Sequence, residues 1–298
     1  MSAAVEDNTV QCCASCGTAE IDDIKLMRCA CKLVKYCSVK CQKDHRPKHK
    51  KACKKRVAEL NDEILFKQPE SSHLGDCPIC CLPLPIDTEK CALYLCCNKR
   101  LCFGCTYSNF KREYEGRLLE KCPFCRTPVP DTEEENNEQL LKRIEANDPV
   151  AIGQMGEIRY NEGDYIAALE YWTRAAALGD SNAHYQLSLL YREGKFVEKD
   201  EKKLLHHLTV AAIAGNPFAR HDLGCVEGRN GQHNRAAKHL IISAKLGHDG
   251  SLERVKEGYQ AGLMSKDDFT AALRGYQAAI AAMKSPQREE ADELFSSD

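Results

Sequence analysis

The apolar positions in the second half of the chain recur with the period of paired helices. Three segments with the same ending, 175–179, 211–215 and 243–247, place their glycines 36 and 32 residues apart. A large apolar residue stands seven positions before each glycine, namely Trp172, Leu208 and Leu240. Glycine commonly ends a helix, and a period of this size is typical of helix pairs stacked as a solenoid. The pattern predicts an all-α repeat region over residues 147–285.

The first half carries clustered cysteines instead of such a pattern. Eighteen of the nineteen cysteines lie between Cys12 and Cys125, mostly in short-spaced pairs. Two thiolates a few residues apart are what a tetrahedral zinc ion takes from one local segment. The sequence does not open with a basic stretch and an apolar run, so we expect a reducing compartment, the cytoplasm, the nucleus or both. In such a compartment clustered cysteines indicate metal ligands rather than disulfides.

The first set of ligands predicts a small zinc module over residues 10–56. Its eight members are Cys13, Cys16, Cys29, Cys31, Cys37, Cys41, His49 and Cys53. Side chains four residues apart share one face of a helix. We therefore expect Cys37 with Cys41, and His49 with Cys53, each to bind one zinc ion from one side. Eight ligands fill two tetrahedral sites and leave no open position for a substrate. An amphipathic helix continues from His49 and forms a helical linker over residues 57–75.

The tract 34–50, VKYCSVKCQKDHRPKHK, resembles the MYND zinc finger. The resemblance implies two zinc ions with interleaved ligands: Cys13, Cys16, Cys37 and Cys41 on one, and Cys29, Cys31, His49 and Cys53 on the other. Two positions depart from the family. Only Ala30 separates the second pair of cysteines, and His45 stands where the family favours Trp, as a substitute donor or a surface residue. Cys12 is then a spare thiol.

The same resemblance implies a protein partner. MYND fingers typically bind short proline-containing peptides. The basic run 48–56 could contact nucleic-acid phosphates, but no aromatic residues are interleaved with it. A charge run alone is weak support for nucleic-acid binding. We therefore expect peptide binding and no nucleic-acid partner.

A second set of cysteines predicts another zinc module over residues 76–128. Three CxxC pairs, each a tight turn that offers two thiolates, begin at Cys77, Cys102 and Cys122. The arrangement resembles a RING finger, a family that braces two zinc ions crosswise. The resemblance implies a complete first site made by Cys77, Cys80, Cys102 and Cys105. It places Cys97, Cys122 and Cys125 in the second site.

The fourth ligand of that second site is open. Lys99 stands where a RING finger has His, and a protonated lysine cannot ligate zinc. Cys96 is the nearest replacement, with Cys91 and Cys81 as more remote candidates. A three-coordinate site with water, or an empty site, is the other alternative. The second module is thus expected to hold one or two zinc ions.

RING fingers that act in ubiquitin ligation dock a ubiquitin-conjugating enzyme in a shallow apolar groove. The resemblance places Ile79 and Pro123 in that groove. It also implies that Arg126 is the arginine that braces ubiquitin against the conjugating enzyme. Such an activity needs no nucleophile in this chain, because the finger contributes positioning and its partner carries the thioester.

The repeats resemble Sel-one-like repeats, relatives of tetratricopeptide repeats. The features that carry this are the Ala-x3-Leu-Gly motif at 219–224 and the Ala-Ala-x-x-Gly helix ends. The resemblance implies a concave face for a protein partner. No phosphate loop, pair of catalytic carboxylates or nucleophile–base constellation stands out in this half.

The remaining segments are charged. The net charge is −2, and no apolar run is long enough to span a bilayer. We expect an acidic linker over 129–146 and a disordered acidic tail over 286–298.

Together these patterns predict a soluble zinc-binding adaptor: two small zinc-stabilised α+β fingers, MYND-like and then RING-like, followed by a helical solenoid. Two functions stay open, a RING-type ubiquitin ligase and a non-enzymatic scaffold or transcriptional co-regulator. A methyltransferase, the other class in which MYND fingers occur, is disfavoured because no stretch is left for a cofactor-binding catalytic domain.

Overall fold

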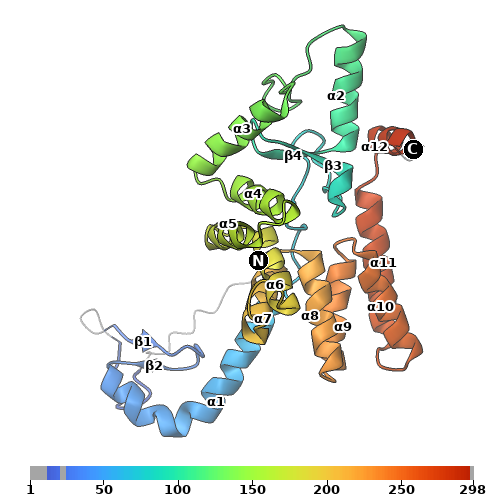
Figure 1. Ribbon diagram of the computed structural model, residues 1–298. Coiled ribbons are helices and arrows are strands. Elements are labelled where there is room, and N and C mark those ends of the chain that lie inside the picture. The colour runs from blue at the N-terminus through green and yellow to red at the C-terminus, as the bar shows by residue number, and fades with distance from the viewer. Residues whose placement is uncertain (1–11, 21–24, 296–298) are drawn as a thin grey trace, which may run out of the picture. The chain divides into compact units, whose positions relative to one another are not determined.

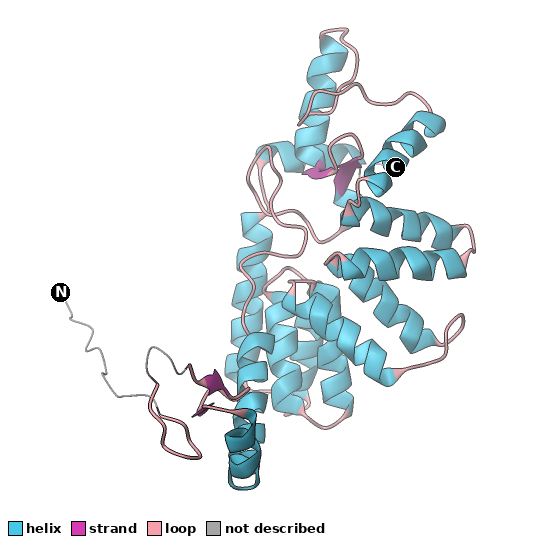
Figure 2. Cartoon of the chain, turned by 90° about the vertical axis from the view of Figure 1, so that its left-hand side faces the viewer, coloured by secondary structure: helices cyan, strands magenta, loops and turns pink. Residues whose placement is uncertain are grey.

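The computed structural model describes residues 12–20 and 25–295, which divide into two compact units at Lys67 and Gln68. Figure 1 labels the elements, and Figure 2 shows that strands occur in two places within helix and loop. In the described part of the chain these are two sheets of two strands each. Among the described residues, no helix is both long and apolar enough to cross a membrane.

The first unit has one short hairpin and one long helix. Strand β1 (Met27–Arg28) pairs antiparallel with β2 (Lys35–Tyr36), and α1 follows over Val39–Leu65. Ser38 caps α1 by accepting a hydrogen bond from the backbone N–H of Cys41 at 3.2 Å, which satisfies a donor of the first turn. Helix α1 buries none of its residues. The buried core is instead Leu26 and Tyr36 with three cysteines, Cys13, Cys29 and Cys31.

The second unit begins with the second cysteine-rich region. A 3-10 turn, η1 (Thr88–Lys90), leads into β3 (Cys91–Tyr94), which pairs antiparallel with β4 (Lys99–Cys102). Helix α2 (Phe103–Glu115) starts directly at the end of β4. Leu84 and Leu101 are buried here with Cys77, Cys91 and Cys102.

The predicted repeat region is a series of short helices in which neighbours along the chain pack against each other (Figure 1). They are α4 (Pro149–Asn161), α5 (Tyr165–Ala177), α6 (Ser181–Glu193), α7 (Glu201–Ile213), α8 (Pro217–Arg229), α9 (His233–Ala244), α10 (Asp249–Gln260) and α11 (Lys266–Ala282). The three glycines of the sequence pattern have φ values of 92°, 88° and 93°, which places each in the left-handed region just after a helix. This confirms the predicted helical-repeat solenoid.

A packed helix takes up most of the segment 129–146, where we expected an acidic linker. Residues Glu133–Glu145 form α3, which packs on α4. Leu140 and Ile144, one turn apart, are 1% and 7% exposed in the core of the first repeats. The acidic run lies in the first turn, where carboxylates interact favourably with the helix dipole, and Thr132 caps it. The charge run that the sequence indicated as a solvated linker is therefore the first turn of an amphipathic helix.

The disordered tail expected over 286–298 also needs correction. Residues Pro286–Phe295 form α12, which lies beside α2 (Figure 1). Ala291 is 1% exposed and Arg288 7% exposed, so the helix is held by burial despite its acidic composition. The last three residues, 296–298, lie outside the described part of the chain.

Candidate metal centres

The structure gathers the sixteen predicted ligands into four groups of four. Cluster 1 is Cys13, Cys16, Cys37 and Cys41, and cluster 2 is Cys29, Cys31, His49 and Cys53. Cluster 3 is Cys77, Cys80, Cys102 and Cys105, and cluster 4 is Cys96, Cys97, Cys122 and Cys125. In each cluster the four donor atoms lie within 4.8 Å of one another.

These separations fit a tetrahedral zinc site. With a Zn–S bond of about 2.3 Å, the edge between two sulfur ligands is about 3.8 Å. The Sγ atoms of Cys80 and Cys102 are 3.8 Å apart, those of Cys97 and Cys122 are 3.7 Å apart, and those of Cys29 and Cys53 are 3.5 Å apart. All nineteen cysteines are thiols rather than disulfides. Four thiols in three clusters, and three thiols with one imidazole in cluster 2, suit closed structural zinc sites with no position left for a substrate.

In the first finger, local backbone turns aim the ligands. The turn after Cys13 is closed by the N–H of Gly17, which donates to the carbonyl of Cys13 at 2.9 Å. In cluster 2, Lys32 adopts the left-handed conformation with φ 60°, and its N–H donates to the carbonyl of Cys29. This tight turn brings two cysteines separated only by Ala30 onto one site, so the shortened spacing does not prevent a four-ligand cluster.

His45 stands outside the clusters. Its Nδ1 lies 3.0 Å from the hydroxyl of Tyr36, and its ring stacks on that of His49 with centroids 5.6 Å apart. Of the two roles weighed for His45, neither substitute donor nor plain surface residue describes it. It braces the ring of a candidate ligand, and the signal for this is its four-residue spacing from His49 on α1.

In the second finger, cluster 4 uses both adjacent cysteines. Cys96 Sγ lies 3.3 Å from the Sγ of Cys125, whereas Cys97 Sγ lies near Cys122. A left-handed residue, Asn98 with φ 54°, follows the pair. Each neighbour thus faces a different member of the last CxxC turn.

The more remote candidates lie elsewhere. The buried thiol of Cys91 faces the carbonyl of Pro85 at 3.8 Å. Cys81 is exposed and adopts the left-handed conformation with φ 56°. Cys12 is also exposed. Lys99 is exposed, with its Nζ 5.9 Å from the ring centroid of Phe124. None of these four described residues belongs to a cluster.

The thiols of one cluster differ in acidity when no cation joins them. Hydrogen bonds with Cys16 and Cys41 raise the pKa of Cys37 to about 12. Burial works to raise the pKa of Cys13, but hydrogen bonds from backbone groups of Cys16, Cys37 and Ser15 outweigh it and lower the pKa to about 6. Zinc binding requires all four groups as thiolates, so metal uptake releases protons and weakens as pH falls.

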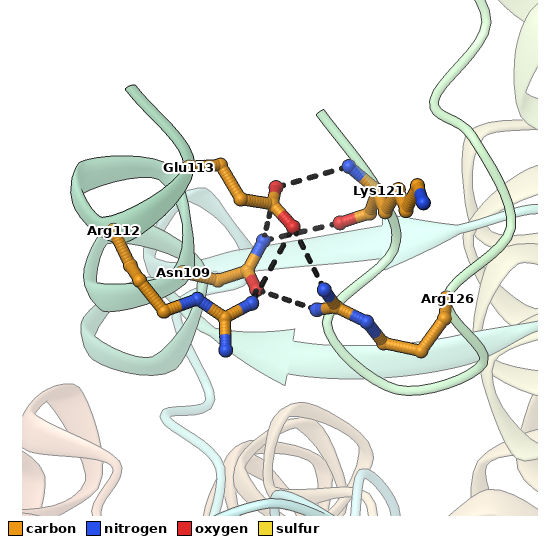
Figure 3. Close-up of polar contacts among 5 residues, drawn as sticks. All are labelled: Asn109, Arg112, Glu113, Lys121 and Arg126. Carbon is orange, nitrogen blue, oxygen red and sulfur yellow. Dashed lines mark hydrogen bonds and ion pairs between the residues drawn. The ribbon is translucent and has the colours of Figure 1, made fainter. Parts of the chain in front are cut away.

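The three predicted partner-binding residues all border zinc turns. Ile79 is 42% exposed between two ligands of cluster 3, and Pro123 is half-buried between two ligands of cluster 4. Arg126 follows directly after Cys125. Its guanidinium donates to Asn109 Oδ1 at 2.9 Å and to Glu113 Oε1 at 3.1 Å (Figure 3).

Glu113 is a residue that the sequence did not reveal. It is 2% exposed and accepts hydrogen bonds from the backbone N–H of Lys121 at 3.0 Å and from Asn109 Nδ2 at 2.8 Å, besides Arg126 (Figure 3). Burial works to raise its pKa, but these hydrogen bonds and the charges of Arg126 and Arg112 hold the pKa below its usual range. Glu113 therefore joins α2 to the last zinc turn. In the sequence it stands in a charged stretch typical of a solvated helix face.

A cavity of about 380 Å³ lies beside cluster 2. Its apolar part includes Tyr36 and Val39, and Val39 is 54% exposed. Four cations of α1 also line it, namely Lys43, Arg46, Lys50 and Lys54. The remaining lining residues are Cys29, Ala30, Gln42, His49 and Cys53, so no described lining residue is a carboxylate.

A comparison with protein families bears on the first finger. Residues 13–53 match the MYND finger family, so this part of the chain is a MYND finger. No curated protein matches the sequence. Among solved structures, the chain is similar to a Sel1 repeat protein from Oxalobacter formigenes, with 28% identity and a TM-score of 0.45 over 52% of this chain and 67% of that one.

A second similar structure is c5321, a protective antigen of uropathogenic Escherichia coli displaying an SLR fold. The identity is 17% and the TM-score 0.34, over 56% of this chain and 48% of that one. The chain therefore spans about half the length of that antigen.

Proposed function

We propose, from the MYND finger and the repeats behind it, that this chain is a zinc-dependent adaptor that binds peptide segments of partner proteins. Clusters 1 to 4 each hold one structural zinc ion, with Cys96 as the fourth ligand of the last site. The single observation that carries the binding role is the cavity beside cluster 2. It lies on the zinc-organised surface of the first finger, so peptide binding and metal binding are coupled there.

The lining of this cavity determines the class of peptide. An apolar part suits a proline or aliphatic side chain, and the four surrounding cations attract carboxylates. Opposite charges around an interface raise specificity and association rate. The ligand is therefore a short peptide in which an apolar residue, such as the proline typical of MYND ligands, is flanked by Asp or Glu.

Fluorescence anisotropy of labelled peptides tests this proposal with the zinc-loaded full chain. We expect a proline peptide flanked by acidic residues to bind at least about tenfold more tightly than the same peptide with Asn and Gln in their place, since every 1.4 kcal/mol is tenfold. The double variant Lys43→Glu/Lys50→Glu should remove that preference. The matched control is Lys48→Glu/Lys51→Glu, the same charge change on α1 at exposed residues that do not line the cavity.

Equal binding of acidic and neutral peptides by the wild type would refute the assigned peptide chemistry. Tighter binding of a duplex oligonucleotide than of any peptide, lost in both double variants, would favour nucleic acid instead. Chelation of zinc should abolish binding of every peptide, because the first finger has almost no other core.

A second candidate function is ubiquitin ligation through the second finger. The observation that favours it is that Ile79 and Phe124 are 42% and 44% exposed on two zinc turns, with the Arg126 guanidinium fixed next to the second one. We expect Ile79→Ala to weaken binding of a conjugating enzyme. Arg126→Ala should slow discharge of its ubiquitin with that binding nearly unchanged. A panel of ubiquitin-charged conjugating enzymes checks this, and no discharge with any of them leaves the non-enzymatic scaffold.

A further inference from the structure

The C-terminal helix α12 reaches back to a zinc turn about two hundred residues earlier in the chain. The guanidinium of Arg288, a residue only 7% exposed, donates from Nη2 to the Sγ of Cys80 at 3.4 Å. Nη2 also donates to the carbonyl of Leu82 at 3.3 Å, and Nη1 donates to that of Pro83 at 2.8 Å. Nearer in the sequence, Nη1 also donates to the carbonyl of Met283 at 2.9 Å. The arginine thus spans from α12 to the turn that carries the first two ligands of cluster 3.

Helix α12 also touches the turn that carries the other two ligands. Gly104 lies between Cys102 and Cys105, and a Cβ at this position would stand 2.8 Å from the backbone N of Arg288 and 2.9 Å from the carbonyl carbon of Gln287. Both atoms belong to the backbone and cannot turn aside. Only glycine allows α12 to approach this closely. The helix therefore contacts both ligand-bearing turns of a single cluster.

The charges explain why a buried arginine is stable here. Zinc with four thiolates carries a net charge of about −2. A buried cation is costly unless it has a partner, and the partners of this guanidinium are three carbonyls and one sulfur. Arginine does not lose its proton in proteins, so it remains a donor at every pH that the chain tolerates. Charge-assisted hydrogen bonds of this kind are stronger than neutral ones.

We propose that Arg288 is an outer-sphere residue of the zinc site at cluster 3, so that docking of α12 determines how firmly that ion is held. The hydrogen bond to Cys80 fixes the position of this sulfur within cluster 3, and the guanidinium charge offsets the negative charge of the thiolates, so both oppose release of zinc. Changes in such supporting residues typically alter metal affinity by 10–100-fold. Arg288 acts through Cys80 and is a positioning residue, not a ligand. The proposal rests on zinc occupying cluster 3, as proposed above.

The test is zinc release from the full chain, measured site by site. Excess chelator is added, and the thiols freed with time are alkylated and located by peptide mass mapping. In Arg288→Met we expect the cysteines of cluster 3 to become reactive at least about tenfold faster, with cluster 1 unchanged. Arg288→Lys should restore part of the retention, because it keeps the charge. Glu290→Gln is the matched control, since Glu290 lies on the same helix and pairs only at the surface, with Lys111 at 3.0 Å.

A second measurement tests whether docking of α12 acts on the ligand sulfurs of cluster 3. With Co²⁺ in the clusters, Arg288→Met should shift the sulfur-to-cobalt charge-transfer band, and Gly104→Ala, which undocks α12 but keeps the arginine, should give the same shift. Release rates and spectra of Arg288→Met equal to those of Glu290→Gln would overturn the proposal. Cysteines of cluster 3 that are reactive in the wild type before chelator is added would instead overturn zinc binding itself at that cluster.

Discussion

The two fingers use the same ligand chemistry but differ in what else supports them. The first finger belongs to a unit that ends at Lys67, and its long helix α1 buries no residue. The second finger belongs to the same unit as the repeats. Besides α12, two further contacts support this region. Arg143 of α3 donates to the carbonyl of Cys96 at 2.7 Å, and the N–H of His73 donates to the carbonyl of Gly215 in the repeats at 3.1 Å.

This difference shows that metal binding can supply nearly all of the stability of a module or only part of it. In the first finger the buried core consists largely of the ligands themselves, so zinc binding is folding. In the second finger the ligands are attached to a solenoid with its own apolar core. Loss of zinc should therefore be all-or-none in one finger and graded in the other.

The largest expected effect is loss of the first finger on removal of a ligand. Cys53→Ser should unfold residues up to about Lys67, because zinc sites of this kind contribute on the order of 10–16 kcal/mol to folding. The repeats should stay folded. Hydrogen–deuterium exchange is the measurement, with Cys12→Ser as a control that lies outside the clusters. Faster exchange in α4 to α11 would mean that the two units are not independent.

A smaller effect is expected from the matching change in the second finger. Cys102→Ser should release α12 and loosen α3, with a loss of about 2–3 kcal/mol from charged hydrogen bonds such as that of Arg288. For a unit of this size the melting temperature should fall by roughly 5–10 °C. Differential scanning calorimetry of the full chain checks this. An unchanged repeat transition would show that the second finger is as independent as the first.

Glu113 offers a finer test within the second finger. Glu113→Gln should lower the free energy of unfolding by about 1–3 kcal/mol, because it weakens charged hydrogen bonds to Arg126 and the Lys121 N–H. Denaturant unfolding checks this, with the exposed Glu115→Gln as control.

The pH dependence of the same stabilisation follows from its sign. Because the folded-state pKa of Glu113 is lowered, its contribution is fully present above the carboxyl's usual pKa of 4.5. It is lost as pH falls through the lowered value. The difference between wild type and Glu113→Gln should therefore be constant near neutrality and shrink in acid. A difference that grows in acid would contradict the assigned sign.

The smallest effect is expected at the surface ion pairs of α12. Lys90 with Asp292 and Lys111 with Glu290 are about half exposed on both sides. Exposed pairs contribute about 0–1 kcal/mol and are screened by salt. Lys111→Ala should change stability by less than about 0.5 kcal/mol, and thermal melts at low and high salt check this. A loss as large as that of Cys102→Ser would place the docking energy of α12 in its ion pairs instead of in Arg288 and Ala291.

The sequence by itself determined what local geometry encodes. The four-residue spacing of His49 with Cys53 puts this pair on one face of α1, and a CxxC turn presents two thiolates from one local segment. The same spacing of Cys37 with Cys41 was expected to do so too, but α1 begins only at Val39, so Cys37 reaches cluster 1 from the turn before the helix. The glycines after the repeat helices mark left-handed positions that other residues rarely adopt. These features depend on a few neighbouring residues, so the ligand groups and the solenoid could be predicted without a structure.

Only the tertiary structure decided which distant groups meet. Cys96 rather than Cys91 or Cys81 joins cluster 4, because the hairpin of β3 and β4 carries its end toward the last zinc turn. Segments that were expected to be an acidic linker and a disordered tail became α3 and α12, because a few apolar or buried residues found partners in the repeats and in the second finger. Such contacts join residues far apart in the chain, and their stability comes from packing of the whole unit, which no local spacing records.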